Sequence, residues 1–407
     1  MPAPESPGTS PGSVMKEHSH GAGAERPASH LHPLGSTDLA DHVVPTGREE
    51  IWRFTPLKRL RDLHKESELD GSAAGVEVQT ADAAVLVQTV PADTPGVRGS
   101  SGYLPTDRVS ARAWNTVESV VRVTVPKETE TSTATVLELR GDETGRAGHV
   151  VIEAEPFSKA TVVLDHQGSG VRADNVEIVV GESAHLTFVT VQDWASDAVH
   201  HANQHAKVGR DATLRHIAVS FGGDLVRVNS SMEYDGPGGE IESLGLYFAD
   251  AGQHIEHRLF VDHNQPNTKS DVDYKGALQG KAAHAVWIGD ILIRKVAEGI
   301  NTYEHNRNLM LTDHCRADSV PNLEIETGEI EGAGHASATG RFDEEQLFYL
   351  QSRGVPEDEA RRLVVYGYFA DIIRRIGLPE LEDRLMRSVE LELAKGTGLA
   401  PASSGGV

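Results

Sequence analysis

The sequence predicts a mainly β fold, in which a stacked β-solenoid lies between a small N-terminal α/β domain and a helical C-terminal domain. Three observations lead to this prediction. Short runs of β-branched residues fill the middle of the chain, a repeat with a step of 28 residues runs through them, and a helical period follows. With 407 residues and 38% hydrophobic content, the chain has enough apolar surface for packed cores.

Both ends of the chain predict disordered tails, at residues 1–40 and 396–407. The first segment is rich in Pro, Gly, Ser, Ala and His, and it lacks the periodic apolar residues that would offset the entropy of ordering. We interpret its histidines as solvated, with loose metal binding as the alternative. These histidines are His18, His20, His30 and His32.

Residues 41–115 have a mixed pattern and predict the small N-terminal α/β domain. Leu57, Leu60 and Leu63 recur every three residues, which favours a short amphipathic helix. A few strands are expected beside this helix.

Residues 116–340 predict the solenoid. Their β-branched runs are bounded by Gly, Asp, Asn or Pro, as strands usually are. The pattern Gly-x-x-Ala-x-Leu occurs at Gly181–Leu186 and again, 28 residues later, at Gly209–Leu214, and Gly252 and Gly280 have the same separation. Such a step is typical of one coil per repeat, in which glycine permits the corner and the Ala and Leu side chains face inward.

Residues 341–395 predict a domain of three helices. Asp343 is expected to cap the first helix, with Gln346 as its capping-box partner, and Gly354 is expected to end it. Pro356 opens the second helix, and a third helix follows it. Apolar residues at spacings of four, three and four mark one face of the second helix: Val365, Phe369, Ile372 and Ile376.

Charge and cysteine content exclude several classes of protein. The chain has 38 basic and 61 acidic side chains, and this net charge of −23 argues against nucleic acid as a partner. No apolar run approaches the ~18 residues of a membrane helix, and the N-terminus lacks the features of a secretory signal. Cys315 is the only cysteine, so an internal disulfide is impossible. We therefore expect a cytoplasmic protein with neither a nucleic-acid nor a membrane partner.

No nucleophile elbow, phosphate-binding loop or His-Glu-x-x-His motif occurs. Two groups of histidines could bind zinc or iron, but alternate side chains of a strand face opposite ways, so surface or coil-stacking roles are preferred. These groups are His200, His201 and His205, and His254, His257 and His263.

A lone Cys315 cannot hold an iron–sulfur cluster, and we interpret it as a small buried residue. A polysaccharide lyase or hydrolase and a His-based metal-binding protein remain alternative functions.

Several motifs, in order along the chain, resemble the SufB/SufD family of iron–sulfur cluster assembly proteins. The resemblance covers about residues 48–395 and is closest to the SufD-type subunit of the SufBCD complex. The motifs that carry it are Glu50–Thr55, His263–Ser270, Tyr274–Leu278, Asn308–Leu311, Ala317–Ile325, Gly334–Ala336, Thr339–Arg341, Asp343–Gln346, Phe348–Leu350 and Ser352–Gly354.

The resemblance implies a right-handed parallel β-helix between helical terminal domains. It also implies a non-catalytic scaffold that pairs through the β-helix with a SufB-like paralogue and binds a SufC-like ABC-type ATPase through residues 341–395. A cysteine desulfurase and a sulfur carrier would act indirectly, through the SufB-like subunit. The expected ATPase contacts are Phe348, Tyr349, Arg353, Gly354 and Phe369.

One departure from the family pattern concerns the Cys-x-His segment near the end of the β-helix. Here the histidine is His335, but Ala333 stands where the family has the thiol. The resemblance therefore implies that His335 is a metal ligand shared across the SufB-like interface, with a hydrogen-bonded interface histidine as the alternative. The chain alone is expected to bind no cofactor. A transient iron–sulfur cluster belongs to the complex, and reduced flavin is associated with family complexes, although no flavin motif occurs here.

Overall fold

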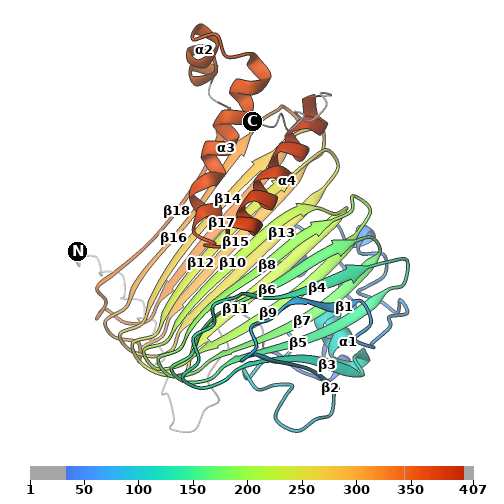
Figure 1. The fold of residues 1–407 in the computed structure, drawn as a ribbon, viewed down its shortest axis with the longest axis vertical. Helices are drawn as coiled ribbons and strands as arrows, with labels where there is room; N and C mark the ends of the chain where they lie inside the picture. The colour runs from blue at the N-terminus through green and yellow to red at the C-terminus, as the bar shows by residue number, and fades with distance from the viewer. Residues whose placement is uncertain (1–33, 343, 398–407) are drawn as a thin grey trace, which may run out of the picture. The chain divides into compact units, whose positions relative to one another are not determined.

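A computed structural model describes residues 34–342 and 344–397, and β-strands dominate this part of the chain (Figure 1). The strands form two sheets, in which strands that are neighbours in a sheet are not consecutive in the sequence. In spatial order, sheet 1 contains β1 (Val76–Thr80), β4 (Thr135–Gly141), β6 (Lys159–Gly168), β8 (His185–Trp194), β10 (Thr213–Gly222), β12 (Glu240–Ala249), β14 (Lys269–Leu278), β16 (Asn301–Met310) and β18 (Gly332–Arg341). Sheet 2 contains β17 (Arg316–Ile325), β15 (His284–Ile293), β13 (His254–His263), β11 (Leu225–Tyr234), β9 (Val199–Val208), β7 (Val171–Val180), β5 (Arg146–Ala154), β3 (Ser119–Val125) and β2 (Leu86–Pro91).

From β3 onward the chain alternates between the two sheets, and every strand pairs in parallel with the strand two positions along. This arrangement is a parallel β-solenoid, and the predicted mainly β fold is confirmed. Aligned partners in successive coils of sheet 1 are 28, 27, 29, 32 and 31 residues apart. They are Leu186, Leu214, Ile241, Ser270, Thr302 and Ala333.

The main core lies between the two sheets, because alternate side chains of every strand face inward. Leu186 and Leu214, from the Gly-x-x-Ala-x-Leu repeat, belong to this core. Gly252 and Gly280 have φ angles of +78° and +81°, so they occupy turns that favour glycine. The 28-residue step therefore reports one coil of the solenoid.

The N-terminal residues extend the two sheets instead of forming a sheet of their own. Strand β1 pairs antiparallel with β4, and β2 pairs antiparallel with β3. The helix α1 (Arg108–Thr116) packs against β5, β7 and β9 on sheet 2. Three short 3-10 helices precede β1: η1 (Leu39–Asp41), η2 (Glu50–Trp52) and η3 (Leu57–Leu60). The leucine spacing of three thus corresponds to a 3-10 helix, which has three residues per turn.

Three α-helices follow the last strand: α2 (Glu344–Ser352), α3 (Glu357–Arg374) and α4 (Pro379–Thr397). Helices α3 and α4 pack on the outer face of sheet 1 (Figure 1). The predicted apolar face of α3 is buried there, and Gly354, with φ of +86°, follows α2. The predicted cap Asp343 lies outside the described residues.

Charged side chains also fasten the helices to sheet 1. Arg384 of α4 donates to Asp165 of β6 at 2.8 Å. Lys275 of β14 is 5% exposed and donates to the carbonyl oxygen of Tyr368, at 3.0 Å, and to Asp371, at 2.5 Å.

No helix in the described ranges combines the length and apolar character that crossing a membrane requires.

Candidate functional site

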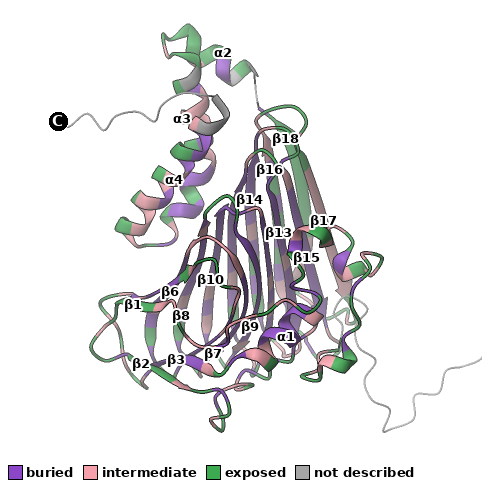
Figure 2. Ribbon diagram, turned by 90° about the vertical axis from the view of Figure 1, so that its right-hand side faces the viewer, coloured by how far each residue is buried: buried purple, intermediate pink, exposed green. Residues whose placement is uncertain are grey.

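The C-terminal end of the solenoid is open. Strands β17 and β18 are the last members of their sheets, so each has one edge without a neighbouring strand among the described residues. Most of β18 is exposed and most of β17 is half-buried, whereas the strands of the central coils are largely buried (Figure 2). An uncovered edge of ten residues presents unpaired N–H and C=O groups, which is a surface suited to another chain.

His335 lies on this edge strand, at the position where the family resemblance implied a shared ligand. Its side chain is 42% exposed, and its Nδ1 atom is 3.7 Å from Glu304 Oε1 on the neighbouring strand β16. Ala333, which replaces the family thiol, is half-buried against the main core. The imidazole is therefore accessible from outside while it contacts a group inside.

Glu304 is the unexpected member of this site. Its side chain is fully buried, and neither carboxylate oxygen has a hydrogen-bond partner among the described residues. Burial, and secondarily the charge of Asp290, raises the pKa of Glu304 to about 8. A Cβ atom on Gly289 would come within 2.4 Å of Glu304 Oε2, so this glycine leaves room for the carboxyl group.

The His335–Glu304 pair offers one nitrogen donor and, once Glu304 has lost its proton, one carboxylate donor side by side. Both atoms suit iron or zinc, but a metal ion or cluster needs about four ligands in total. Any metal held here would therefore require ligands from a second molecule. Sequence reasoning missed Glu304, although an acid in the alternating pattern Thr302-x-Glu304-x-Asn306 was a usable signal.

The helix α2 presents aromatic side chains to solvent. Phe348 is 71% exposed and Tyr349 57% exposed, and the guanidinium carbon of Arg353 lies 5.1 Å from the Tyr349 ring centroid. Phe369, by contrast, is fully buried between α3 and sheet 1. This burial removes Phe369 from the expected contact surface, because it packs the helix onto the solenoid.

Neither histidine group expected from the sequence forms a cluster. On β9, His200 faces the interior, where it contacts Asp174, whereas His201 faces outward and lies 5.8 Å from the Trp52 ring. His263 of β13 stacks on Tyr234 of the neighbouring strand β11, as coil stacking predicts. His257 of β13 stacks on Tyr247 of β12, which belongs to the other sheet. Of the two expected roles, a surface position does not apply to His200, His201, His254, His257 and His263, which are all buried.

Cys315 is half-buried beside the main core. Its Sγ atom donates to the carbonyl oxygen of Thr312, 3.0 Å away, and burial raises the pKa of the thiol. A raised pKa makes the thiolate scarce, so Cys315 is a poor nucleophile and a poor metal ligand.

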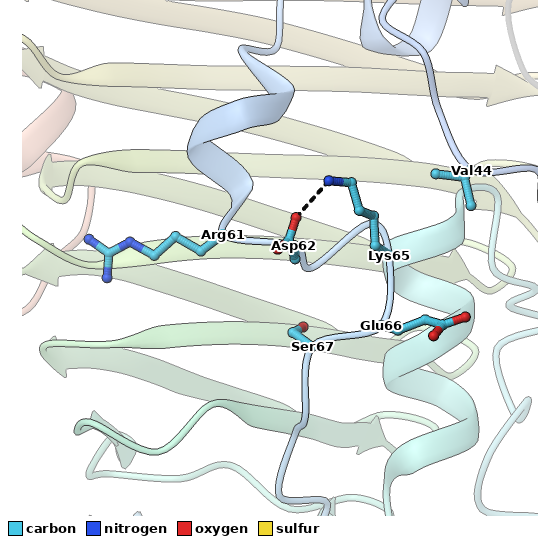
Figure 3. Close-up of a pocket in the computed structure, with 6 residues that line it drawn as sticks. All are labelled: Val44, Arg61, Asp62, Lys65, Glu66 and Ser67. Carbon is cyan, nitrogen blue, oxygen red and sulfur yellow. Dashed lines mark ion pairs between the residues drawn. The ribbon is translucent and has the colours of Figure 1, made fainter.

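A pocket of about 550 Å³ lies in the N-terminal region (Figure 3). Its lining is mostly charged, and Asp62 pairs with Lys65 at 2.9 Å, while Arg61 points away from that pair. An exposed i,i+3 ion pair contributes little energy, and the lining brings no catalytic set together. The pocket residues are Val44, Arg61, Asp62, Lys65, Glu66 and Ser67.

Comparison with known proteins matches residues 137–368 to the family model described as SUF system FeS cluster assembly, SufBD core domain. A Mycobacterium bovis protein described as an iron-sulfur cluster assembly SufBD family protein is 52% identical over 368 residues, covering 88% of this chain and 92% of its own length. A second Mycobacterium bovis protein of the same description is 27% identical over 223 residues, covering 55% of this chain and 26% of its own. The iron-sulfur cluster assembly protein SufD of Bacillus subtilis is 28% identical over 276 residues, covering 65% and 62% respectively, which supports the SufD-type resemblance. The chain belongs to the SufBD family of iron–sulfur cluster assembly proteins.

Proposed function

We propose that this protein is a non-catalytic scaffold subunit of the SufD type, which acts in the cytoplasm as part of a SufBCD complex. It pairs with a SufB-like paralogue through the open end of the solenoid and offers its C-terminal helices to a SufC-like ABC-type ATPase. The iron–sulfur cluster is the cargo of the complex. Sulfur reaches the SufB-like subunit from a cysteine desulfurase and its carrier, and any reduced flavin belongs to the complex.

The observation that carries this proposal is the contrast between the two ends of the solenoid. At the N-terminal end, the outermost strands β1 and β2 have five and six residues, and Pro91 ends β2. Short strands and proline are the usual protection of a sheet edge. At the C-terminal end, β17 contains Pro321, but β18 has ten residues and no proline. Every N–H group of β18 that points away from β16 is therefore available to a partner strand.

The incomplete donor set supports a partner that also supplies ligands. His335 and Glu304 provide two metal-donor atoms, and Ala333 provides no thiol. A paralogue with cysteine at the open end would complete the set. Mycobacterium bovis holds two distinct SufBD family proteins, which is consistent with a paralogue as the partner.

The exposed side of α2 and α3 supports ATPase docking. Besides Phe348 and Tyr349, α3 exposes Leu363 and Tyr366, at 49% and 43%. Exposed aromatic side chains and arginine are enriched at the centres of protein interfaces. Phe369 acts indirectly, because its burial holds α3 in place on sheet 1.

A single affinity purification from native cells tests the proposal through three separable variants. The wild-type chain should bring down an ABC-type ATPase and a cysteine-bearing paralogue. Tyr349→Ala with Arg353→Ala should lose the ATPase and keep the paralogue. A proline substitution in β18 should abolish binding of the paralogue and leave binding of the ATPase intact. It is placed at Ala336 or Ser337, whichever residue has its N–H group directed away from β16.

The third variant, His335→Ala, should keep both partners and lower the yield of assembled cluster. Gln79→Pro is the matched control for the proline variants, because it lies in an edge strand at the opposite end, at a break in the register between β1 and β4. Wild-type protein that purifies without either partner, or unchanged cluster yield with His335→Ala, would contradict the assignment.

A further inference from the structure

Three metal-binding side chains from different strands meet inside the first coils of the solenoid. They are His166 of β6, Asp174 of β7 and His200 of β9, and one donor atom from each lies within 4.8 Å of the others. All three are buried, with side-chain exposures of 1%, 1% and 0%. These coils are distinct from the open end that holds His335, and neither the family nor the proposed scaffold function assigns them a role.

The His166 ring aims an unprotonated nitrogen into this cluster. Its Nδ1 atom is 3.0 Å from the carbonyl oxygen of Val191, which can only accept, so Nδ1 carries the hydrogen. Burial lowers the pKa of His166 to about 3, so the ring is neutral. The Nε2 atom therefore has a lone pair. It lies 4.0 Å from Asp174 Oδ2 and has no hydrogen-bond partner among the described residues.

His200 is held in the same orientation. Its Nδ1 atom is 2.7 Å from Gln192 Oε1, and the indole N–H of Trp194 donates to that same oxygen at 3.1 Å. Because an indole nitrogen can only donate, the acceptor must be the amide oxygen, so His200 Nδ1 also carries a hydrogen. Its Nε2 atom then faces Asp174 Oδ2 at 2.8 Å.

In the absence of a metal, this contact requires a proton between His200 Nε2 and Asp174 Oδ2, on one group or the other. A metal ion between Nε2 and the carboxylate removes the need for that proton. Metal-binding histidines normally donate their other N–H to an oxygen, as both rings do here.

Asp174 is prepared as an anionic ligand. Burial raises the pKa of Asp174, but the charge of Arg172 is the largest of the effects that oppose burial, and the pKa stays well below the usual range. Arg172 Nε donates to both carboxylate oxygens, at 2.7 and 3.0 Å, which fixes their orientation. On β5, a Cβ atom at Gly148 would lie 2.0 Å from Asp174 Oδ1, so only glycine leaves space for this carboxylate.

We propose that His166 Nε2, His200 Nε2 and Asp174 Oδ2 bind one divalent first-row transition metal ion, Zn²⁺ or Fe²⁺, within the solenoid. Bonds of ~2.0 Å in tetrahedral geometry place donor atoms about 3.3 Å apart. The two separations from Asp174 Oδ2, 2.8 Å to His200 and 4.0 Å to His166, lie on either side of this distance, and the two histidine nitrogens lie within 4.8 Å of each other. The nearby charge of Arg172 opposes any cation, so the site favours metals with high imidazole affinity over Mg²⁺ and Ca²⁺.

Metal analysis of the full-length, untagged protein tests the site. Cells are grown with Zn²⁺ or with Fe²⁺, the latter under anaerobic conditions, and the purified protein is passed over a chelating resin. Wild-type protein should retain one metal ion per chain, and the two growth conditions identify the metal. His166→Asn keeps an N–H for the Val191 carbonyl but removes Nε2, and it should retain at least tenfold less metal.

The matched control is His216→Asn, another fully buried histidine, whose Nε2 contacts Gln204. His216→Asn should retain as much metal as the wild type. Any metal bound by the N-terminal histidines is the same in the wild type and in both variants, so it does not affect the comparison. If His166→Asn fails to fold, the visible absorption of Co²⁺-loaded wild-type protein replaces it, because a tetrahedral site absorbs strongly. A wild-type chain that neither retains metal nor shows this absorption, or equal metal in wild type and His166→Asn, would overturn the proposal.

Discussion

The buried acid Glu304 should make the stability of the C-terminal coils depend on pH, and Glu304→Gln should remove that dependence. The folded chain raises the pKa of this carboxyl from 4.5 to about 8. Between these pH values the folded state holds a proton that the unfolded state releases. The free energy of unfolding therefore falls as pH rises through this window and levels off above the folded pKa.

The size of the effect follows from the shift in proton affinity. At about 1.4 kcal/mol for each tenfold change, the shift corresponds to roughly 5 kcal/mol between the two ends of the window. Glutamine has the same shape and cannot ionise. We expect Glu304→Gln and wild type to be similarly stable near about pH 5, and the variant to be more stable near about pH 9.

Urea denaturation at the two pH values measures this difference, and hydrogen exchange in β16 locates it, because coils of a solenoid can open separately. Glu329→Gln is the matched control, since Glu329 is exposed and lies in the same end of the solenoid. A stability difference between Glu304→Gln and wild type that is equal at both pH values would refute the reasoning.

Two further substitutions test the packing. Phe369→Ala should lower the free energy of unfolding by about 3–5 kcal/mol, because Phe369 is fully buried between α3 and sheet 1; the control Tyr366→Ala, at a 43% exposed position, should change it by less than about 1 kcal/mol. A similar urea midpoint for both would show that α3 does not pack as described. Gly245→Ala should cost about 1–3 kcal/mol, because its Cβ atom would lie 1.9 Å from the buried ring of Tyr274. Gly340→Ala meets nothing within 4 Å and should be tolerated, so equal losses for the two glycine variants would contradict this explanation.

Sequence periodicity was sufficient to predict the regular parts of the fold, which are the coils of the solenoid and the C-terminal helices. The Gly-x-x-Ala-x-Leu step matches one coil, because Leu186 and Leu214 are register partners on adjacent strands. The apolar face of α3 was also predicted correctly, since Val365 and Phe369 are both fully buried. Such patterns are local, and each coil or helix repeats the same requirement to bury one face.

Burial of single side chains could not be predicted in the same way. Phenylalanine is a residue type that is common at protein interfaces, but Phe369 is a core residue because α3 packs on sheet 1. The histidines near residue 200 are adjacent in sequence, yet strand alternation separates His200 from His201. His166 and His200 are instead brought together from strands in different sheets.

The sequence by itself determined the solenoid, the helical C-terminus and, through its motifs, membership of the SufBD family, because repeated local patterns carry that information. Only the tertiary structure decided which edge is open, that Glu304 lies behind His335, and that Asp174 joins two distant histidines. The physical reason is that stacking coils aligns residues about 28 positions apart, and the electrostatics of a buried group depend on those neighbours.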